Sequence, residues 1–310
     1  MKKLSFLLLL LLSLSFVSCA QVQGNSSEEG VPVRDTFGNT AVLTEQARVV
    51  SCYGSYADCW LLSGGSLVGV TDDAVEEGLN LSSSVEIVGS VKSVDLEKIL
   101  TLSPDYVILS ADLAAHLTLQ EALDTMGIAY GFFRVDTFAD YKGMMAQFCT
   151  VNGRPDLYET NVLAVEKRIE EIRAKIPQTS SERFLLLRVY STGMKAKGAD
   201  ILAGQILLEF GLTNIAQGQS SLLENLSAEE ILLQNPAYIF TVPMGDPSAA
   251  EAFWAQTVMH NPAWQSLTAI KEGACFMLPK DLFHYKPNER WDECYEYLAK
   301  ILYPELFAEP

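Results

Sequence analysis

Two stretches of the sequence decide its fold: DLEKILTLSPDYVI at residues 95–108 and SAEEILLQNPAYIF at residues 227–240. Aligned at an offset of 132 residues, they share a glutamate, an Ile-Leu pair, a proline, a tyrosine and the apolar run that follows. Asp95 and Ser227 are good helix N-caps, and Pro104 and Pro236 prevent each helix from continuing. Each copy therefore predicts a short helix leading into a strand, and the repeat predicts two related halves.

Strand-like and helix-like segments alternate outward from both copies. Short apolar runs typical of strands occur at 48–52, 67–70, 85–88, 106–109, 130–135, 184–190, 238–242 and 275–278. Patterns typical of helices lie between them, at 95–102, 115–126, 138–152, 201–210, 228–234, 249–259, 262–270 and 288–302. This alternation predicts an α/β fold of two lobes, each with a mostly parallel sheet flanked by helices.

One long helical pattern, about Pro155 to Ile176, separates the two halves. Its apolar residues step by three or four positions and so share one face: Val162, Val165, Ile169, Ile172 and Ile176. Pro177 ends the pattern. We therefore expect an N-terminal lobe at 33–152, a connecting helix at 153–178 and a C-terminal lobe at 179–310.

The first residues have the pattern of an export signal. Lys2 and Lys3 precede an apolar run from Leu4 to Leu14, which is short for a membrane span. A small residue before Cys19 resembles the bacterial lipobox, in which the cysteine receives a lipid. We expect a signal peptide at 1–19 with Cys19 as lipid anchor and a flexible tether at 20–32. An ordinary signal peptide with an incidental cysteine is the alternative.

Composition narrows the class of function. The chain has 39 acidic and 22 basic residues, a net charge of −17, which argues against nucleic acid or an anionic membrane surface as a partner. No Walker loop, dinucleotide fingerprint, nucleophile elbow or H-E-x-x-H motif occurs, so we predict no catalytic residues and no enzyme. A metallocluster enzyme and a surface adhesin on the same fold remain as alternatives.

Cysteines and histidines do not predict a metal site. The five cysteines after Cys19 form no C-x-x-C pair, which argues against structural zinc and against a metal cluster. Cys52 and Cys59 could form a disulfide, although core cysteines are favoured. Three histidines are too few to bind bare zinc or manganese, but His284 could ligate a haem iron or a cobalt axially.

Glu97 and Glu229 occupy the same position in the two copies of the repeat. Each lies in the first turn of its helix, where the helix dipole favours a carboxylate, and this alone could explain both. Alternatively, each lobe presents one exposed carboxylate to a two-fold symmetric partner. We favour the second interpretation.

The chain resembles the substrate-binding proteins of ABC importers for iron complexes and cobalamin. The resemblance covers residues 33–303 and rests on the order of several motifs: 35–39, 48–51, 88–90, 95–109, the long helix, 225–229, 261–264 and 284–291. It implies the class III periplasmic-binding-protein fold, in which two lobes on one long helix clamp a ligand between them. It also implies that Glu97 and Glu229 pair with arginines of a permease dimer.

The resemblance further implies a monomer on the outer side of a cell membrane, with no permanent cofactor. The expected ligand is a ferric siderophore, with cobalamin or haem as the alternatives. Ligands of open α/β sheets bind at the carboxyl ends of the strands. In the first lobe, the residues predicted to contact the ligand are therefore Tyr53, Ser55, Tyr56, Ser90, Ser110 and Arg134. In the second lobe, the residues predicted to contact the ligand are Tyr190, Lys195, Lys197, Met244, His284, Tyr285 and Lys286.

Overall fold

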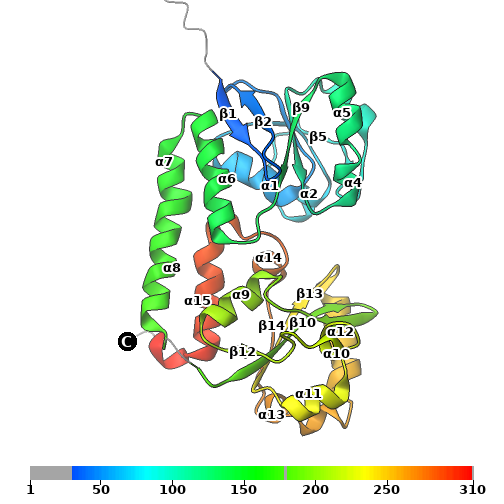
Figure 1. Cartoon of the computed structure of the whole chain (residues 1–310), viewed down its shortest axis with the longest axis vertical. Coiled ribbons are helices and arrows are strands. Elements are labelled where there is room, and N and C mark those ends of the chain that lie inside the picture. Colours follow the sequence, from blue (N-terminus) through cyan, green and yellow to red (C-terminus); the bar gives the residue numbers. More distant parts are fainter. Residues whose placement is uncertain (1–29, 178–179, 309–310) are drawn as a thin grey trace, which may run out of the picture.

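Two α/β lobes lie one above the other and are joined along one side by helices (Figure 1). The computed structural model describes residues 30–177 and 180–308. The expected signal peptide, Cys19 and most of the tether lie outside these residues. Within the described ranges, no helix has both the length and the apolar character needed to cross a bilayer.

The first lobe is built on a five-stranded parallel sheet of order β5-β4-β3-β8-β9. Its strands are β3 (Val49–Ser51), β4 (Leu67–Val70), β5 (Glu86–Ile87), β8 (Tyr106–Ser110) and β9 (Ala129–Phe133). Side chains alternate across the sheet. Tyr106 and Ile108 face one core cluster, which contains Trp60 and Phe148, whereas Val107 faces the other. Helices α1 (Gly54–Leu62) and α6 (Phe138–Val151) belong to the first cluster, and α3 (Leu96–Thr101) and α5 (Gln120–Met126) to the second.

The second lobe has a mixed sheet of order β11-β10-β13-β14, with β12 also paired to β10. Its strands are β10 (Arg183–Tyr190), β11 (Gly193–Ala196), β12 (Thr213–Asn214), β13 (Tyr238–Pro243) and β14 (Cys275–Met277). Only β11 is antiparallel, because it folds back on β10 as a hairpin. The predicted strands at 184–190, 238–242 and 275–278 are therefore confirmed, and the hairpin is an addition to them.

The repeat predicted from the sequence is present in three dimensions. Tyr106 pairs with Val49 in the first sheet, and Tyr238 pairs with Phe184 in the second. Helix α3 and its counterpart α11 (Ala228–Gln234) both begin at the predicted caps: Asp95 accepts a hydrogen bond from the Lys98 amide at 3.1 Å, and Ser227 accepts one from the Glu230 amide at 3.3 Å. Two halves thus share a helix–strand unit.

Two connections join the lobes. The first is the predicted long helix, which runs through α7 (Pro155–Tyr158), a π-helical turn (Glu159–Leu163) and α8 (Ala164–Lys175). Its apolar face is buried as expected. The second follows α14 (Lys280–Phe283): residues 284–290, here called the return segment, reach the first lobe before α15 (Trp291–Leu302) runs back beside α8. The sequence did not predict this second connection, which further limits how far the lobes can separate.

Several predicted helices are shorter or divided. Residues 115–126 form α4 (Ala114–Leu117) and α5, and residues 249–259 form α12 (Pro247–Trp254) followed by a π-helical turn (Ala255–Met259). Two small hairpins were not predicted: β1 (Val31–Arg34) with β2 (Thr40–Leu43), and β6 (Gly89–Ser90) with β7 (Ser93–Val94). The remaining helices are α2 (Asp73–Glu76), α9 (Leu202–Glu209), α10 (Ser220–Leu223) and α13 (Thr268–Lys271), with single 3-10 turns at Trp264–Ser266, Asn288–Arg290 and Pro304–Leu306.

Candidate ligand-binding cleft

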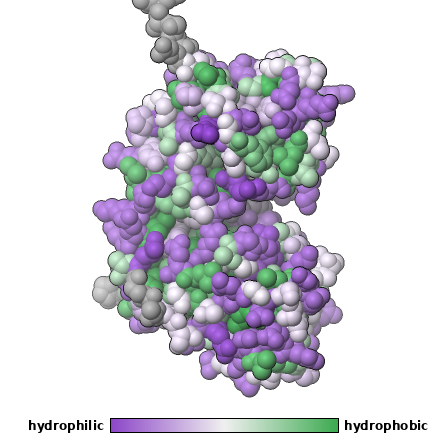
Figure 2. All heavy atoms as spheres, viewed as in Figure 1, coloured by the Kyte–Doolittle hydropathy of each residue, from purple (hydrophilic) through white to green (hydrophobic). Residues whose placement is uncertain are grey.

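A cleft separates the lobes on the side opposite α8. Figure 2 shows the surface hollowed there, with hydrophilic residues along the rim. A pocket of about 50 Å³ forms part of its floor. Both lobes and the return segment line this pocket: Val135, Asp136, Arg188, Asp200, Ile201, Leu202, Phe283, His284, Tyr285, Lys286, Pro287 and Trp291.

The return segment is held against the first lobe by buried hydrogen bonds. Asn288, which is 1% exposed, donates from Nδ2 to the Ser55 carbonyl oxygen at 2.8 Å and to Asp58 Oδ2 at 2.7 Å. The Lys286 amide donates to Ser55 Oγ at 3.2 Å. Asn288 has a φ of +50°, a left-handed conformation that asparagine tolerates better than most residues. These contacts fix the floor of the cleft to the beginning of α1.

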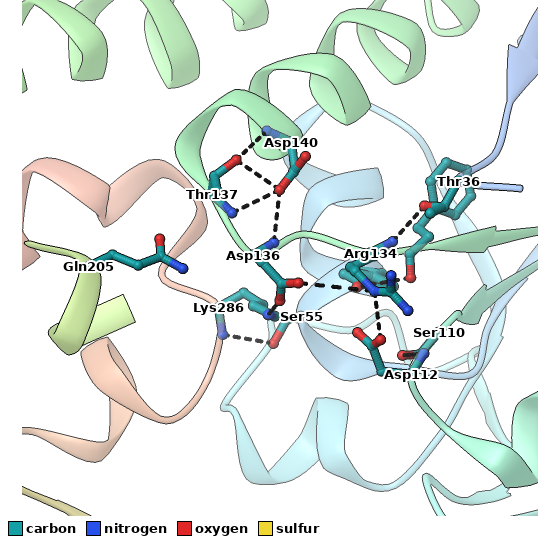
Figure 3. Close-up of polar contacts among 12 residues, drawn as sticks. Thr36, Ser55, Ser110, Asp112, Arg134, Asp136, Thr137, Asp140, Gln205 and Lys286 are labelled. Atoms are coloured by element: carbon teal, nitrogen blue, oxygen red, sulfur yellow. Dashed lines mark hydrogen bonds and ion pairs between the residues drawn. The ribbon is translucent and has the colours of Figure 1, made fainter. Parts of the chain in front are cut away.

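Charged side chains lie where strands β8 and β9 end. Arg134 Nε lies 2.6 Å from Asp112 Oδ1 and 4.0 Å from Asp136 Oδ2 (Figure 3). Lys286 Nζ of the return segment lies 3.3 Å from Asp136 Oδ1. The predicted residues Arg134 and Lys286 are therefore brought into one charged network at the rim, and both side chains are still partly exposed to solvent.

The structure corrects two predicted contact residues at the start of α1. Tyr56 is 1% exposed and donates from its hydroxyl to the Phe133 carbonyl oxygen at 3.2 Å, because α1 turns it into the core. Ser55 is also buried, and its hydroxyl donates to both carboxylate oxygens of Glu77 at 2.9 and 3.1 Å. Both residues stabilise the wall of the cleft from behind and are not available to touch a ligand. Only Tyr53 of this loop remains partly exposed.

Carboxyl groups gather beneath α1. Burial, and then the nearby charges of Asp73 and Asp58, raise the pKa of Glu77 to about 8 against the opposing hydrogen bonds from Ser55. Burial, followed by the charge of Asp58, raises the pKa of Glu289 to about 7. A large part of both groups is therefore protonated at neutral pH. Glu289 belongs to the return segment, and Glu77 accepts hydrogen bonds from Ser55 at the start of α1. Neither carboxyl group lines the pocket.

Two of the predicted residues of the second lobe lie at the ends of neighbouring strands. Val189 pairs with Pro243, so Tyr190 and Met244 follow at adjacent positions, and both are half-buried. Lys195 is exposed on the hairpin opposite Arg188. Lys197 forms an ion pair with Asp200, a residue of the pocket. Tyr190 and Met244 thus lie together where β10 and β13 end, whereas Lys195 and Lys197 lie further back, beside Arg188 and Leu186.

His284 and Tyr285 line the pocket side by side, with ring centroids 5.1 Å apart. Lys280 Nζ lies 5.0 Å from the Tyr285 ring centroid. Burial, and then the positive charges of Lys280 and Arg188, lower the pKa of His284 to about 4. The imidazole is therefore neutral at physiological pH, which is the state that can accept a hydrogen bond or ligate a metal.

Hydrogen bonds of a buried histidine hold the segments that carry Ser90 and Ser110. The Ser110 amide donates to His116 Nδ1 at 2.9 Å, so Nε2 carries the proton and donates to the Val91 carbonyl oxygen, also at 2.9 Å. This pair of bonds ties the β6–β7 hairpin, which carries half-buried Ser90, to the end of β8. Ser110 itself is 3% exposed, so it supports this region and does not face a ligand.

Arg188 is a pocket residue that the sequence analysis missed. It lies in β10 within the run FLLLRVY, where the flanking residues Leu187 and Val189 are fully buried. A charged residue inside an otherwise apolar strand was the signal that could have identified it, because burying an arginine requires a specific partner.

Glu97 and Glu229 are exposed in the first turns of α3 and α11. Cys52 and Cys59 are buried free thiols, as are Cys149 and Cys294, while Cys275 is half-buried and free. Among residues 30–177 and 180–308, no group of three or more histidine, cysteine, aspartate or glutamate side chains is arranged to hold a metal ion.

Comparison with known proteins gives consistent matches. A family model described as "Periplasmic binding protein" matches residues 49–282. The putative ABC transporter substrate-binding lipoprotein YhfQ of Bacillus subtilis is 25% identical over 292 residues, covering 88% of each chain. The Fe(3+)-citrate-binding protein YfmC of the same organism is 24% identical over 294 residues, covering 90% of each chain. The crystal structure of the triscatecholate siderophore-binding protein FeuA of Bacillus subtilis with ferri-bacillibactin has a TM-score of 0.69 at 18% identity, covering 89% of this chain and 99% of that one.

Proposed function

Because the chain belongs to the periplasmic binding protein family, we propose that it is the extracytoplasmic solute-binding component of an ABC importer and carries a metal complex of the iron-siderophore type. The observation that carries the proposal is the pocket on the cleft floor, whose walls come from both lobes and the return segment. Relatives named for iron uptake and for ferric citrate binding support an iron complex as cargo.

Binding in this cleft would be reversible and without turnover. Ligands of α/β sheets meet loops at the carboxyl ends of strands, and here such loops from two sheets face each other. Side chains proposed to contact the ligand are Tyr53, Ser90, Arg134, Tyr190, Lys195, Lys197, Met244, His284, Tyr285 and Lys286. Aromatic rings suit an organic chelator, and the cations suit its anionic groups.

Delivery would use the two glutamates of the repeat. Glu97 and Glu229 are exposed at equivalent positions of the two lobes. We propose that each pairs with an arginine of one subunit of a permease dimer. Exposed charge pairs contribute mainly to orientation and association rate, which suits a protein that must dock and leave repeatedly.

The proposed protein is a monomer tethered to the cell membrane through a lipid on Cys19. The word lipoprotein in the name of YhfQ supports this anchor. The tether after Cys19 would let the folded body reach the permease. The structure shortens the expected tether by two residues, because strand β1 already begins at Val31. A mutant with Cys19→Ala should be released into the medium or periplasm, whereas metabolic labelling with palmitate should mark only the unchanged chain.

The experiment that tests the function is a ligand titration of residues 21–310. Trp291 lines the pocket, so tryptophan fluorescence should report occupancy directly. We expect saturable quenching, with a dissociation constant in the micromolar range or below, by a ferric siderophore or ferric citrate, and none by the iron-free chelator. Saturation by cobalamin or haem alone would identify the alternative cargo. No saturation by any of these complexes would contradict the proposal.

A further inference from the structure

Three residues that line the pocket each have a buried polar atom without a hydrogen-bond partner among the described residues. These atoms are Nε of Arg188, Nδ1 of His284 and Nε1 of Trp291. Folded proteins pair nearly all of their buried polar atoms, so three exceptions in one pocket need an explanation. Trp291 is 2% exposed and its ring packs on Phe138 at 5.7 Å between centroids. Its indole nitrogen is therefore shielded from bulk solvent, and the pocket that Trp291 lines is a place where a bound group could pair with it.

The missing partner is a hydrogen-bond acceptor. Arginine Nε and tryptophan Nε1 can only donate. The imidazole of His284 is neutral, so its Nδ1 can carry the proton and donate as well. A donor-rich ligand group such as an amine or an ammonium would leave at least two of the three atoms unpaired.

The missing partner also carries negative charge. Within the described part of the chain, Arg188 has no ion pair, whereas the neighbouring acids of the pocket have cations of their own. Asp136 is paired with Lys286 at 3.3 Å, and Asp200 with Lys197. An unpaired charge in a partly buried site destabilises the folded state. In a chain of net charge −17, a lone cation at the cleft floor is best explained by an anion that binds there.

Arg188 acts across the cleft. Burial, followed by the Glu77 carboxylate, raises the pKa of the Tyr53 hydroxyl in the first lobe, and the charge of Arg188 opposes this increase. Because Tyr53 and Arg188 come from different lobes, the arginine acts on the space between them. A group bound to Arg188 would therefore lie in the cleft and not behind the second sheet.

The size of the pocket limits what binds at this point. A pocket of about 50 Å³ admits one small group and not a whole metal complex. From these observations we infer that Arg188, His284 and Trp291 form a seat for one carboxylate of the ligand. The inference rests on the proposed function and narrows it: the cargo is an anionic, carboxylate-bearing metal complex. The amide carbonyls of a corrinoid can accept these hydrogen bonds but would leave the charge of Arg188 unpaired.

The test compares two arginines of one strand. Arg183 begins β10 and is exposed, so Arg183→Gln is the matched control for Arg188→Gln. We expect Arg188→Gln to weaken binding of ferric citrate or haem by about tenfold or more, as for loss of a charge-assisted bond. Arg183→Gln should stay within about twofold of the unchanged protein. Equal affinity of Arg188→Gln and the unchanged protein would overturn the inference.

Two ligands separate the sources of the carboxylate. If haem propionates occupy the seat, the unchanged protein should bind the dimethyl ester of haem about tenfold more weakly than haem. Its affinity for the ester should equal the affinity of Arg188→Gln for haem. If citrate occupies it, ferric citrate should bind and show the dependence on Arg188. Binding of cobalamin with an affinity equal to that of either anion would contradict a carboxylate seat.

A stability measurement and a second variant show whether weaker binding comes from misfolding. Arg188→Gln removes an unpaired charge, so its melting temperature without ligand should equal or exceed that of the unchanged protein. Trp291→Phe removes only the indole donor and should weaken binding about three- to tenfold by calorimetry, while Trp264→Phe should not. If the unchanged protein binds none of the complexes, the proposed function fails. If it binds one and both seat variants match it, only the carboxylate seat fails.

Discussion

Ser103 and Asn235, 132 residues apart, adopt the same left-handed backbone conformation, with φ values of +46° and +41°. Each precedes the proline of its repeat, and the residue after that proline closes an equivalent bond in both lobes. Asp105 donates its amide to the Arg48 carbonyl oxygen at 2.8 Å, and Ala237 donates to that of Arg183 at 2.9 Å. The turns that follow α3 and α11 are therefore built in the same way in both lobes. Glu97 and Glu229 accordingly occupy equivalent positions.

The paired glutamates should matter for delivery and not for binding. Reversing both charges, with Glu97→Lys and Glu229→Lys, should abolish uptake of the metal complex by intact cells, because each lobe would then repel a permease arginine. Ligand affinity in solution should stay within about twofold. Glu121→Lys with Glu251→Lys is the control, since it changes the net charge equally at exposed positions of both lobes. A loss of ligand affinity in the test pair would instead place the glutamates at the cleft.

Glu77 should make the protein less stable as pH rises. The pKa of Glu77 is about 8 in the folded state and about 4.5 for an unperturbed glutamate. Its contribution to the free energy of unfolding is therefore complete below pH 4.5 and is lost as pH rises through 8. Glu77→Gln should therefore match the unchanged protein at pH 4. At pH 8.5 it should be more stable by at least about 1 kcal/mol, or roughly 2–4 °C in melting temperature. Exposed Glu76→Gln should show no such difference between the two pH values.

Asn288 should be essential for stability. Asn288→Ala removes both donated hydrogen bonds, leaves Asp58 without its amide partner and places alanine at a φ of +50°. We expect a loss of about 2–4 kcal/mol in urea unfolding. Asn288→Gly separates the causes, because glycine accepts the left-handed conformation but makes no side-chain bond. If Asn288→Gly were as stable as the unchanged protein, the loss in Asn288→Ala would come from backbone strain, and the hydrogen bonds of Asn288 would not be what stabilises the return segment.

His116 should make the protein sensitive to acid. Burial lowers the pKa of His116 in the folded state, against the opposing hydrogen bond to the Val91 carbonyl oxygen. The neutral ring accepts a hydrogen bond from the Ser110 amide. The contribution of His116 to the free energy of unfolding is therefore present above pH 6.5 and is lost as pH falls below that value. His116→Asn should be less stable at pH 7 but lose less additional stability between pH 7 and pH 5. Exposed His260→Asn is the control, and equal slopes for all three proteins would contradict this role.

Local sequence patterns were sufficient to predict the two-lobed architecture. The repeat, the N-caps Asp95 and Ser227 and the prolines that follow are short-range signals, and they gave correct helices and strands in both halves. The apolar face of the long helix was predicted for the same reason, since a period of three to four residues reports burial directly. Elements without such a signal, such as the β10–β11 hairpin, were missed.

The cleft could be predicted only in part. Strand ends identified the loops that line it, but not which side chains of a loop turn inward. Ser55 and Tyr56 lie one and two positions after Gly54, the first residue of α1. The rotation of α1 against the sheet, set by its contacts with α6 and the return segment, turns both side chains into the core. Arg188 was missed because its surroundings come from residues nearly one hundred positions later.

By itself, the amino-acid sequence determined most of the helices and strands, the division into two related lobes and the acidic composition of the chain, because these depend on neighbouring residues and on composition. Only the tertiary structure decided that residues 284–290 return to the first lobe, that Asn288 locks them to α1, and that Arg188, His284 and Trp291 share one pocket. Contacts between residues so distant in the chain follow from how whole elements pack, and no local pattern encodes the distance or direction between them.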